Sequence, residues 1–351
     1  NKLSQELKDL IFEVLANSGI SVSDKKAVKF KRIGLKRGYN SSIYKLVTDD
    51  KRIFVIKITD HEEDPVLNIL HNRELEFYEW LEGVQSEATS ESTDLSQLLR
   101  FYGGSRCDSE PGVLIMNDLS SRVGIQPNYT IGYSPDLAFQ IVKQIARYQS
   151  AYLCSDNELS IGKELIDYTS SCLRSIPKLD ELTWMSEDEK RYLREWAEPE
   201  KLFALHTEIP EGFEGISPVL AHCDLWPGNM IFEQREEETS LLAILDWQTF
   251  KIGNPLLDIS TVIGENMTAE DRREYTQPIL SLYVDEMDKR KDGFKKPFQM
   301  TVEKARSNLS HSLRWPCIQT MFAVTRSRND TKDEGQEMGR LSIRLRELIK
   351  D

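Results

Sequence analysis

The chain has 351 residues, of which 39% are hydrophobic and 29% charged, a composition typical of a soluble globular protein. This length exceeds what one hydrophobic core usually organises, so we expect two lobes or domains. The formal net charge of −13 at pH 7 argues against a nucleic-acid partner, because phosphate backbones need a basic surface.

The five cysteines are scattered, odd in number and without a C-x-x-C pair. This pattern predicts free thiols in a reducing compartment, and the cytoplasm is the expected location. No apolar run approaches the 18 residues of a membrane span, so we expect no membrane partner. The sequence predicts no particular oligomeric state.

The first third of the chain alternates strand-like and helical patterns. Residues 3–16 carry apolar residues on one helical face. Three strands, a helix and two more strands are then predicted, in this order: 27–35, 42–47, 52–58, 66–82, 98–102 and 113–116. These elements predict a compact antiparallel sheet lobe, and we assign residues 1–118 to it as an N-terminal nucleotide-binding lobe.

The remainder, residues 119–351, is mainly helical and is predicted to form a C-terminal catalytic and acceptor-binding lobe. Six helices are expected there, at 136–153, 161–174, 186–205, 269–290, 299–326 and 332–349. Short strands lie within residues 219–247. The predicted class is therefore α+β, with a ligand-binding cleft between a small sheet lobe and a larger helical lobe.

A polar loop inside residues 219–247 carries the most informative motif. His222 and Asp224 are followed by Asn229, and Asp246 ends an apolar run 17 residues beyond Asn229. Phosphoryl transfer from ATP uses a carboxylate facing the acceptor hydroxyl, plus an amide and a second carboxylate that hold Mg²⁺. We predict these catalytic roles for Asp224, Asn229 and Asp246, the last two as the metal ligands. For Asp224 or Asn229 alone, capping a turn would be the simpler explanation.

Two further residues are predicted to support this loop. His222 is expected to brace it by hydrogen bonds, because no second His lies at the spacing of a zinc site. Asp258 either accepts hydrogen bonds beneath the loop or is the N-cap of the next helix, and the sequence favours neither.

Lys57 lies inside an apolar, β-branched run, where a charged side chain needs an explanation. It is either an edge-strand Lys that faces solvent and discourages aggregation, or a cation directed at ATP phosphates and held by a carboxylate of the next helix. Glu74 is the predicted partner by its position on that helix, with Glu76 and Glu79 as alternatives.

The segment 34–42, between the first two strands, contains Gly38, Asn40, Ser41 and Ser42. Its glycines, amide and hydroxyls would let donors approach phosphates closely, although the same residues also suit an ordinary hairpin turn. No G-x-x-x-x-G-K-[ST] loop exists in the chain, which disfavours a P-loop enzyme.

Taken in order, these residues resemble the protein-kinase-like small-molecule kinases, and most closely the ecdysteroid-kinase-like (CHK) group, especially its nematode members. Choline kinases and aminoglycoside phosphotransferases are related to that group. The resemblance covers about residues 27–262, in which the matching motifs are Lys57, Arg73-Glu74 with Phe77-Tyr78, Leu114–Ser120, His222-x-Asp224-Leu225-Trp226-x-x-Asn229, Leu245–Gln248, and Gly253-Asn254-Pro255 with Asp258.

The resemblance implies a two-lobed protein-kinase-like fold in which the backbone of Met116, Asn117 and Asp118 forms the hinge that holds adenine. Three residues depart from the group's pattern. Cys223 replaces a usual Gly, Asn117 replaces a common acidic residue, and Gln248 stands where choline kinases have Glu. The last difference weakens the interpretation of this chain as a choline kinase, because the quaternary ammonium of choline favours anionic and aromatic walls.

The leading hypothesis is thus a kinase that uses ATP and Mg²⁺ to phosphorylate a hydroxyl of a small organic molecule. A protein kinase is disfavoured, because only six residues separate Asp246 from Gly253 and leave no room for an activation segment. A catalytically silent nucleotide-binding protein is disfavoured because every catalytic side chain is present. Trp315, His311 and Arg314 are possible acceptor walls, although Trp315 is more simply explained as core.

Overall fold

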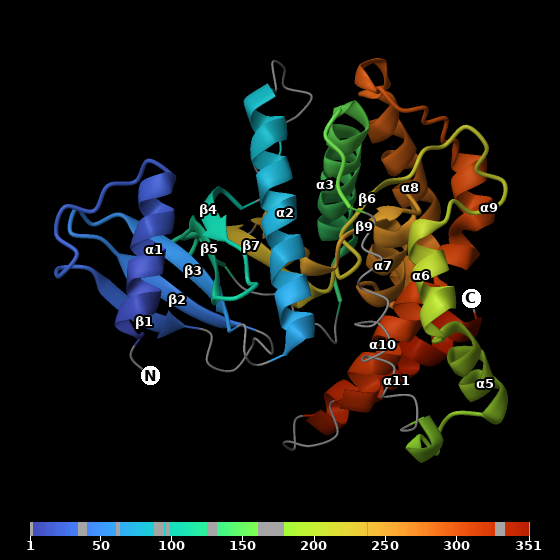
Figure 1. Ribbon diagram of the computed structural model, residues 1–351. Coiled ribbons are helices and arrows are strands. Elements are labelled where there is room, and N and C mark those ends of the chain that lie inside the picture. Colours follow the sequence, from blue (N-terminus) through green and yellow to red (C-terminus); the bar gives the residue numbers. More distant parts are fainter. Residues whose placement is uncertain are drawn as a thin grey trace.

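The computed structural model describes residues 3–33, 41–60, 64–87, 95, 99–124, 132–160, 179–236, 238–326 and 334–350. A five-stranded antiparallel sheet lies at the N-terminal end and a helical part follows it, with α2 (Pro65–Glu87) standing between them in Figure 1. The predicted α+β class, with a small antiparallel sheet and a larger helical part, is confirmed. The division between residues 118 and 119 stays a prediction.

The sheet has the strand order β1-β2-β3-β5-β4. Its strands lie close to the predicted ranges: β1 (Lys29–Ile33), β2 (Ser42–Val47), β3 (Ile53–Thr59), β4 (Phe101–Ser105) and β5 (Gly112–Asn117). In the central strand β3, Lys57 pairs with Ile43 of β2 on one side and with Leu114 of β5 on the other. Lys57 is therefore an interior residue of the sheet and is not on an edge strand.

The two faces of the sheet have different partners, because successive side chains of a strand point to opposite faces. Ile56 and Ile115 pack with helix α1 (Gln5–Asn17), which covers one face in Figure 1. Leu114 and Met116 belong instead to the large core that contains α2. Lys57 alternates with Ile56 and pairs with Leu114, so it lies on the face turned away from α1.

The helical part has these bounds: α3 (Pro135–Cys154), α5 (Glu187–Trp196), α6 (Pro199–Thr207), α7 (Leu257–Glu265), α8 (Ala269–Asp288), α9 (Val302–Ser312), α10 (Arg314–Arg326) and α11 (Glu334–Lys350). The single helices predicted at 186–205 and 299–326 were wrong, because each is two helices. Pro199 begins α6 and Pro316 lies in the first turn of α10, where a proline cannot continue the preceding helix. The helix predicted at 161–174 falls outside the described residues. None of the described helices is long and apolar enough to cross a membrane.

Two small antiparallel sheets hold the polar loop of residues 222–229. Strand β6 (Val219–Ala221) leads into the loop and pairs with β9 (Lys251–Gly253). Strand β7 (Met230–Arg235) leaves the loop and pairs with β8 (Glu238–Ile244), which ends just before Asp246. Both ends of the loop are thereby fixed, and Asp246 is brought back beside Asn229 by a hydrogen bond from Leu245 N to Asn229 O of 2.7 Å.

We expect Gly253→Ala to destabilise the protein by at least about 2 kcal/mol, because the added Cβ would clash with backbone atoms that can move only by displacing α6. A Cβ at Gly253 would lie 2.0 Å from His206 O and 2.4 Å from Thr207 Cα. The matched control is Gly83→Ala in α2, where the nearest atom would be 3.6 Å away. That change should stabilise the protein by about 1 kcal/mol through helix propensity. Urea unfolding measures both, and equal effects would contradict the close packing of β9 on α6.

Candidate active site

Two carboxylates from distant parts of the chain meet at the ammonium of Lys57. Its Nζ lies 2.5 Å from Glu74 Oε2 of α2 and 2.5 Å from Asp246 Oδ1, which follows β8. Lys57 is only 9% exposed, so the ammonium does not face bulk water. Of the two alternatives to Glu74, Glu76 accepts hydrogen bonds from Ser160 N and Oγ and is not paired with Lys57.

Burial alone would lower the pKa of Lys57, but the adjacent Asp246 and Glu74 carboxylates raise it above its usual value. The side chain is therefore a permanent cation at neutral pH. Burial raises the pKa of Glu74, and the Lys57 ammonium opposes that rise. A buried carboxylate of this kind is stable only while the cation stays beside it.

Aromatic stacking places α2 against the segment that follows Asp246. Phe77 of α2 stacks on Trp247, with ring centroids 3.9 Å apart and planes 5° apart. One turn earlier, the Arg73 guanidinium lies over the Phe250 ring and donates to Phe250 O at 2.5 Å. These contacts flank Glu74 and fix the distance between α2 and Asp246.

Asp258 holds the start of the polar loop from below. It lies in the first turn of α7, whose N-cap is Leu256, and it is completely buried. Its carboxylate accepts from His222 N at 2.7 Å, from Cys223 N at 3.0 Å and from Tyr148 OH at 2.5 Å. Asp258 thus contacts the loop backbone and does not cap α7.

His222 connects the polar loop to Leu245, the residue that follows β8. Its Nδ1 accepts from Asp224 N at 3.2 Å, so Nε2 carries the proton and donates to Leu245 O at 2.8 Å. Burial lowers the pKa of His222, which keeps the ring neutral. The side chain is occupied by backbone partners on both sides.

Asp224 and Asn229 contact each other directly. Asn229 Nδ2 donates to Asp224 Oδ2 and to Asp224 O, both at 2.9 Å. Although part of Asp224 stays exposed, burial together with the charges of Asp246 and Glu265 raises its pKa to about 7. Gln248 Nε2 donates to Asp246 Oδ2 at 3.1 Å, so this amide faces Asp246.

The structure describes all of the predicted hinge residues but only some of the predicted phosphate-loop residues. Met116 is buried, Asn117 Oδ1 accepts from Arg100 N, and Asp118 accepts from Lys45 at 2.8 Å and from Ser120. Gly38 and Asn40 lie outside the described residues. Ser41 and Ser42 make side-chain hydrogen bonds to Thr59 and Arg32 respectively.

The predicted acceptor-wall residues contact side chains of the helical part. The Arg314 guanidinium stacks on Trp196 and hydrogen-bonds His311. Trp315 is 9% exposed and meets His206 edge to face at 4.2 Å. These contacts are typical of packing within the helical part.

Two residues that support the loop were missed by sequence reasoning: Tyr148 of α3, which donates to Asp258, and Gln319 of α10. Gln319 lies within 3.5 Å of Asp224 Oδ1 and of Cys223 O. A polar Gln-Thr pair inside the otherwise apolar stretch 315–324 is the signal that could have drawn attention to Gln319.

A family model, DUF1679, described as "Uncharacterized oxidoreductase dhs-27", matches residues 31–322. The chain belongs to this family. The comparison with curated proteins finds no match.

Solved structures share the fold along the whole chain. An amicoumacin kinase in complex with AMP-PNP, Ca²⁺ and Ami is 11% identical, with a TM-score of 0.55 over 99% of this chain and 96% of that one. A choline kinase from Cryptosporidium parvum is 10% identical, with a TM-score of 0.54 over 97% and 95%. The GDP complex of aminoglycoside 2'-phosphotransferase-IIIa is 12% identical, with a TM-score of 0.51 over 98% and 99%. The predicted two-lobed, protein-kinase-like fold of small-molecule kinases is confirmed.

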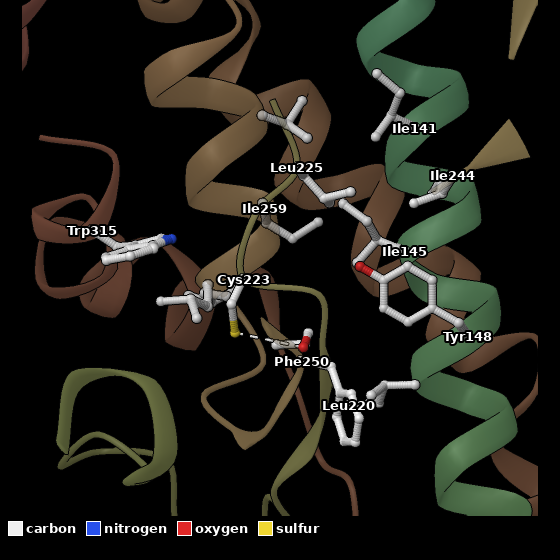
Figure 2. Close-up of a cluster of buried hydrophobic side chains, with 14 of the residues drawn as sticks. Ile141, Ile145, Tyr148, Leu220, Cys223, Leu225, Ile244, Phe250, Ile259 and Trp315 are labelled. Atoms are coloured by element: carbon white, nitrogen blue, oxygen red, sulfur yellow. Dashed lines mark hydrogen bonds between the residues drawn. The ribbon is translucent and has the colours of Figure 1, made fainter. Parts of the chain in front are cut away.

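Cys223 adopts a left-handed backbone with φ of 67°. Its thiol is buried in the apolar cluster of Figure 2, which includes Phe250 and Ile259, and lies 3.5 Å from Ala221 O. Burial raises the pKa of this thiol to about 12, so it stays protonated. The side chain fits, but the backbone is strained.

We expect Cys223→Gly to be more stable than Cys223→Ala by about 1 kcal/mol. Both variants lose the buried thiol, and only the Ala variant keeps a Cβ in the left-handed region. Thermal and urea unfolding of the two proteins gives the difference. A Gly variant no more stable than the Ala variant would show that the backbone at this position is unstrained.

Proposed function

We propose that the protein transfers the γ-phosphoryl group of ATP to a hydroxyl of a small organic molecule. The observation that carries this proposal is the convergence of Lys57, Glu74 and Asp246, with Asp246 adjacent to the paired Asp224 and Asn229. This arrangement provides one cation for phosphates, two oxygen ligands for a metal and one carboxylate for the acceptor. The neighbours' complexes with AMP-PNP and GDP support nucleotide binding in this fold.

Each residue would have a distinct task. Lys57 would bind the α- and β-phosphates, held in place by Glu74. The backbone of Met116–Asp118 would contact adenine, and Gly38, Asn40, Ser41 and Ser42 would cover the phosphates. Cys107, Cys154, Cys223 and Cys317 are free thiols in the described part of the chain, and a cytoplasmic setting belongs to the proposal.

Asn229 and Asp246 fit a Mg²⁺ site that is completed by the nucleotide. Asn229 uses its Nδ2 on Asp224, which leaves its amide oxygen as the ligand atom. In the part of the chain that the structure describes, no three His, Cys, Asp or Glu side chains converge to hold a metal. A site with few protein ligands plus phosphate oxygens suits Mg²⁺, which would neutralise the phosphate charge.

Asp224 would orient the acceptor hydroxyl and take its proton. Its raised pKa suits a group that accepts a proton near neutral pH. His222, which is neutral and bonded on both sides, supports the loop and is not the base. Asp258 would keep the loop backbone in place through its two N–H contacts.

The family's description names an oxidoreductase, but the fold gives that activity little support. All paired strands in the described ranges run antiparallel, whereas the dinucleotide-binding fold is built on a parallel sheet. The sequence also contains no G-x-G-x-x-G fingerprint. A choline- or aminoglycoside-type acceptor is the closest alternative, and a silent nucleotide-binding protein is the second.

We expect Mg·ATP to raise the melting temperature of the parent protein and of Asp224→Asn, but not of Asp246→Asn. Asp246 has φ of 63°, and Asn tolerates this left-handed backbone, so the substitution removes a charge without adding strain. Thermal shift with Mg·ATP, and with ATP plus EDTA as control, measures the difference. Unchanged Mg·ATP stabilisation of Asp246→Asn would remove Asp246 from the metal site.

Turnover is tested by incubating the protein with Mg·ATP and a polar-metabolite extract and searching by mass spectrometry for products heavier by one phosphoryl group. Asp224→Asn is the matched control, and we expect its product signal to fall at least about 100-fold, as for loss of a general base. Products that persist equally with Asp224→Asn would come from contaminating enzymes. No product with the parent protein in extracts rich in alcohols would favour the silent nucleotide-binding alternative.

A further inference from the structure

Gln319 reaches the polar loop from α10, far from any kinase motif in the sequence. Its Nε2 lies 3.4 Å from Asp224 Oδ1 and 3.5 Å from Cys223 O. Gln319 is only 8% exposed. A buried amide is costly unless its donors and acceptor are satisfied, so these contacts account for the presence of Gln at this position.

The surroundings also fix which way the amide points. Cys223 O and Asp224 Oδ1 are both acceptors, so they require the NH₂ group. On the other side, Thr261 Oγ1 of α7 shares its single proton between Leu257 O at 3.2 Å and Gln319 Oε1 at 3.4 Å. With the amide reversed, its oxygen would face Cys223 O and Asp224 Oδ1 instead. These two acceptors therefore orient Gln319 so that its N–H groups point at the loop.

The two oxygens of Asp224 then have different partners. Oδ2 accepts from Asn229 at 2.9 Å, and Oδ1 accepts from Gln319. A carboxylate offers about four lone-pair sites, so two donors fix its plane and still leave room for a hydroxyl. We propose that Gln319 is a positioning residue that, together with Asn229, sets the plane of the Asp224 carboxylate toward the acceptor. The proposal rests on the proposed phosphotransferase function.

A neutral amide suits this task better than a charged side chain would. Asp224 already lies in the field of Asp246 and Glu265, which disfavours its charged form. A Lys or Arg at residue 319 would counter that field, but it would also form an ion pair that competes with the acceptor for Asp224. Gln supplies directed donors and no charge, and it leaves the metal-binding groups untouched.

Gln319→Met tests the proposal, because Met keeps the length of the side chain and removes both donors. We expect kcat for ADP formation from Mg·ATP, with the polar-metabolite extract as acceptor source, to fall roughly tenfold, as for loss of one hydrogen bond to a charged group. The KM for ATP should stay unchanged, because Gln319 touches no nucleotide-binding residue. An unchanged kcat, or equal changes in kcat and KM with a lowered melting temperature, would overturn the proposal.

Thr320→Val is the matched control on the same helix. Its hydroxyl is fully buried and makes no hydrogen bond with the described residues, so its removal tests packing of α10 without touching Asp224. We expect parental kcat and a melting temperature equal to or above that of the parent, because the variant removes an unsatisfied buried hydroxyl. A tenfold loss of kcat in this variant too would assign the Gln319 effect to a disturbed helix.

A second variant and a readout that does not depend on activity complete the test. Thr261→Val removes the hydroxyl that contacts the amide oxygen, and we expect a smaller fall in kcat in the same direction, so this variant carries the test if Gln319→Met fails to fold. In ¹⁵N spectra, the side-chain NH₂ signal that Gln319→Met removes should shift in Asp224→Asn. A signal unmoved by Asp224→Asn would refute the contact. If the parent protein transfers no phosphoryl group while this signal does shift, the proposed function fails and the contact stands.

Discussion

The ion pairs of Lys57 are the constraint on which the rest of the site depends. One ammonium holds Glu74 and Asp246, and these three residues come from a strand of the sheet, from α2 and from the end of a hairpin in the helical part. Taking such charges out of water is expensive, and removal of any partner leaves a buried charge uncompensated. With Lys57 protonated and both carboxylates ionised, the trio carries a net charge of −1, and Asp224 adds another when it is ionised. This excess of negative charge favours a site that is completed by metal cations.

The packing of α2 also supports the position of Glu74, alongside its ion pair with Lys57. Phe77 stacks on Trp247, and Arg73 covers Phe250, so α2 is attached to the segment on either side of Asp246. Stacked and cation–π contacts of this kind need no ligand to form. The packing therefore holds the carboxylates in place independently of the proposed nucleotide. Such preorganisation lowers the cost of arranging charges during the reaction.

The sequence predicted what lies within short stretches and missed what converges over long distances. The motif from His222 to Asn229, and Asp246 after its apolar strand, could be recognised because neighbouring residues and strand ends limit where their side chains can go. Glu74 could be selected from three candidates by helix position. Tyr148 and Gln319 were missed, because their contacts with Asp258 and Asp224 join residues 110 and 95 positions apart. The two split helices were missed because apolar periodicity continues through Pro199 and Pro316, although the backbone cannot.

Backbone strain at Cys223 and Asp246 follows from the same requirement for convergence. Both residues have positive φ, and they lie where the chain must turn sharply to present Asp224 and Asp246 to one another. A non-glycine residue resists that conformation, so the surrounding structure must hold it. Asp258 does so at Cys223 by accepting from two successive N–H groups, while Trp247 anchors the chain just after Asp246. The buried charge of Asp258 is stable in turn because three donors surround it. The strained loop and the buried Asp258 carboxylate stabilise each other through these hydrogen bonds. A change to either one would therefore also move Asp224.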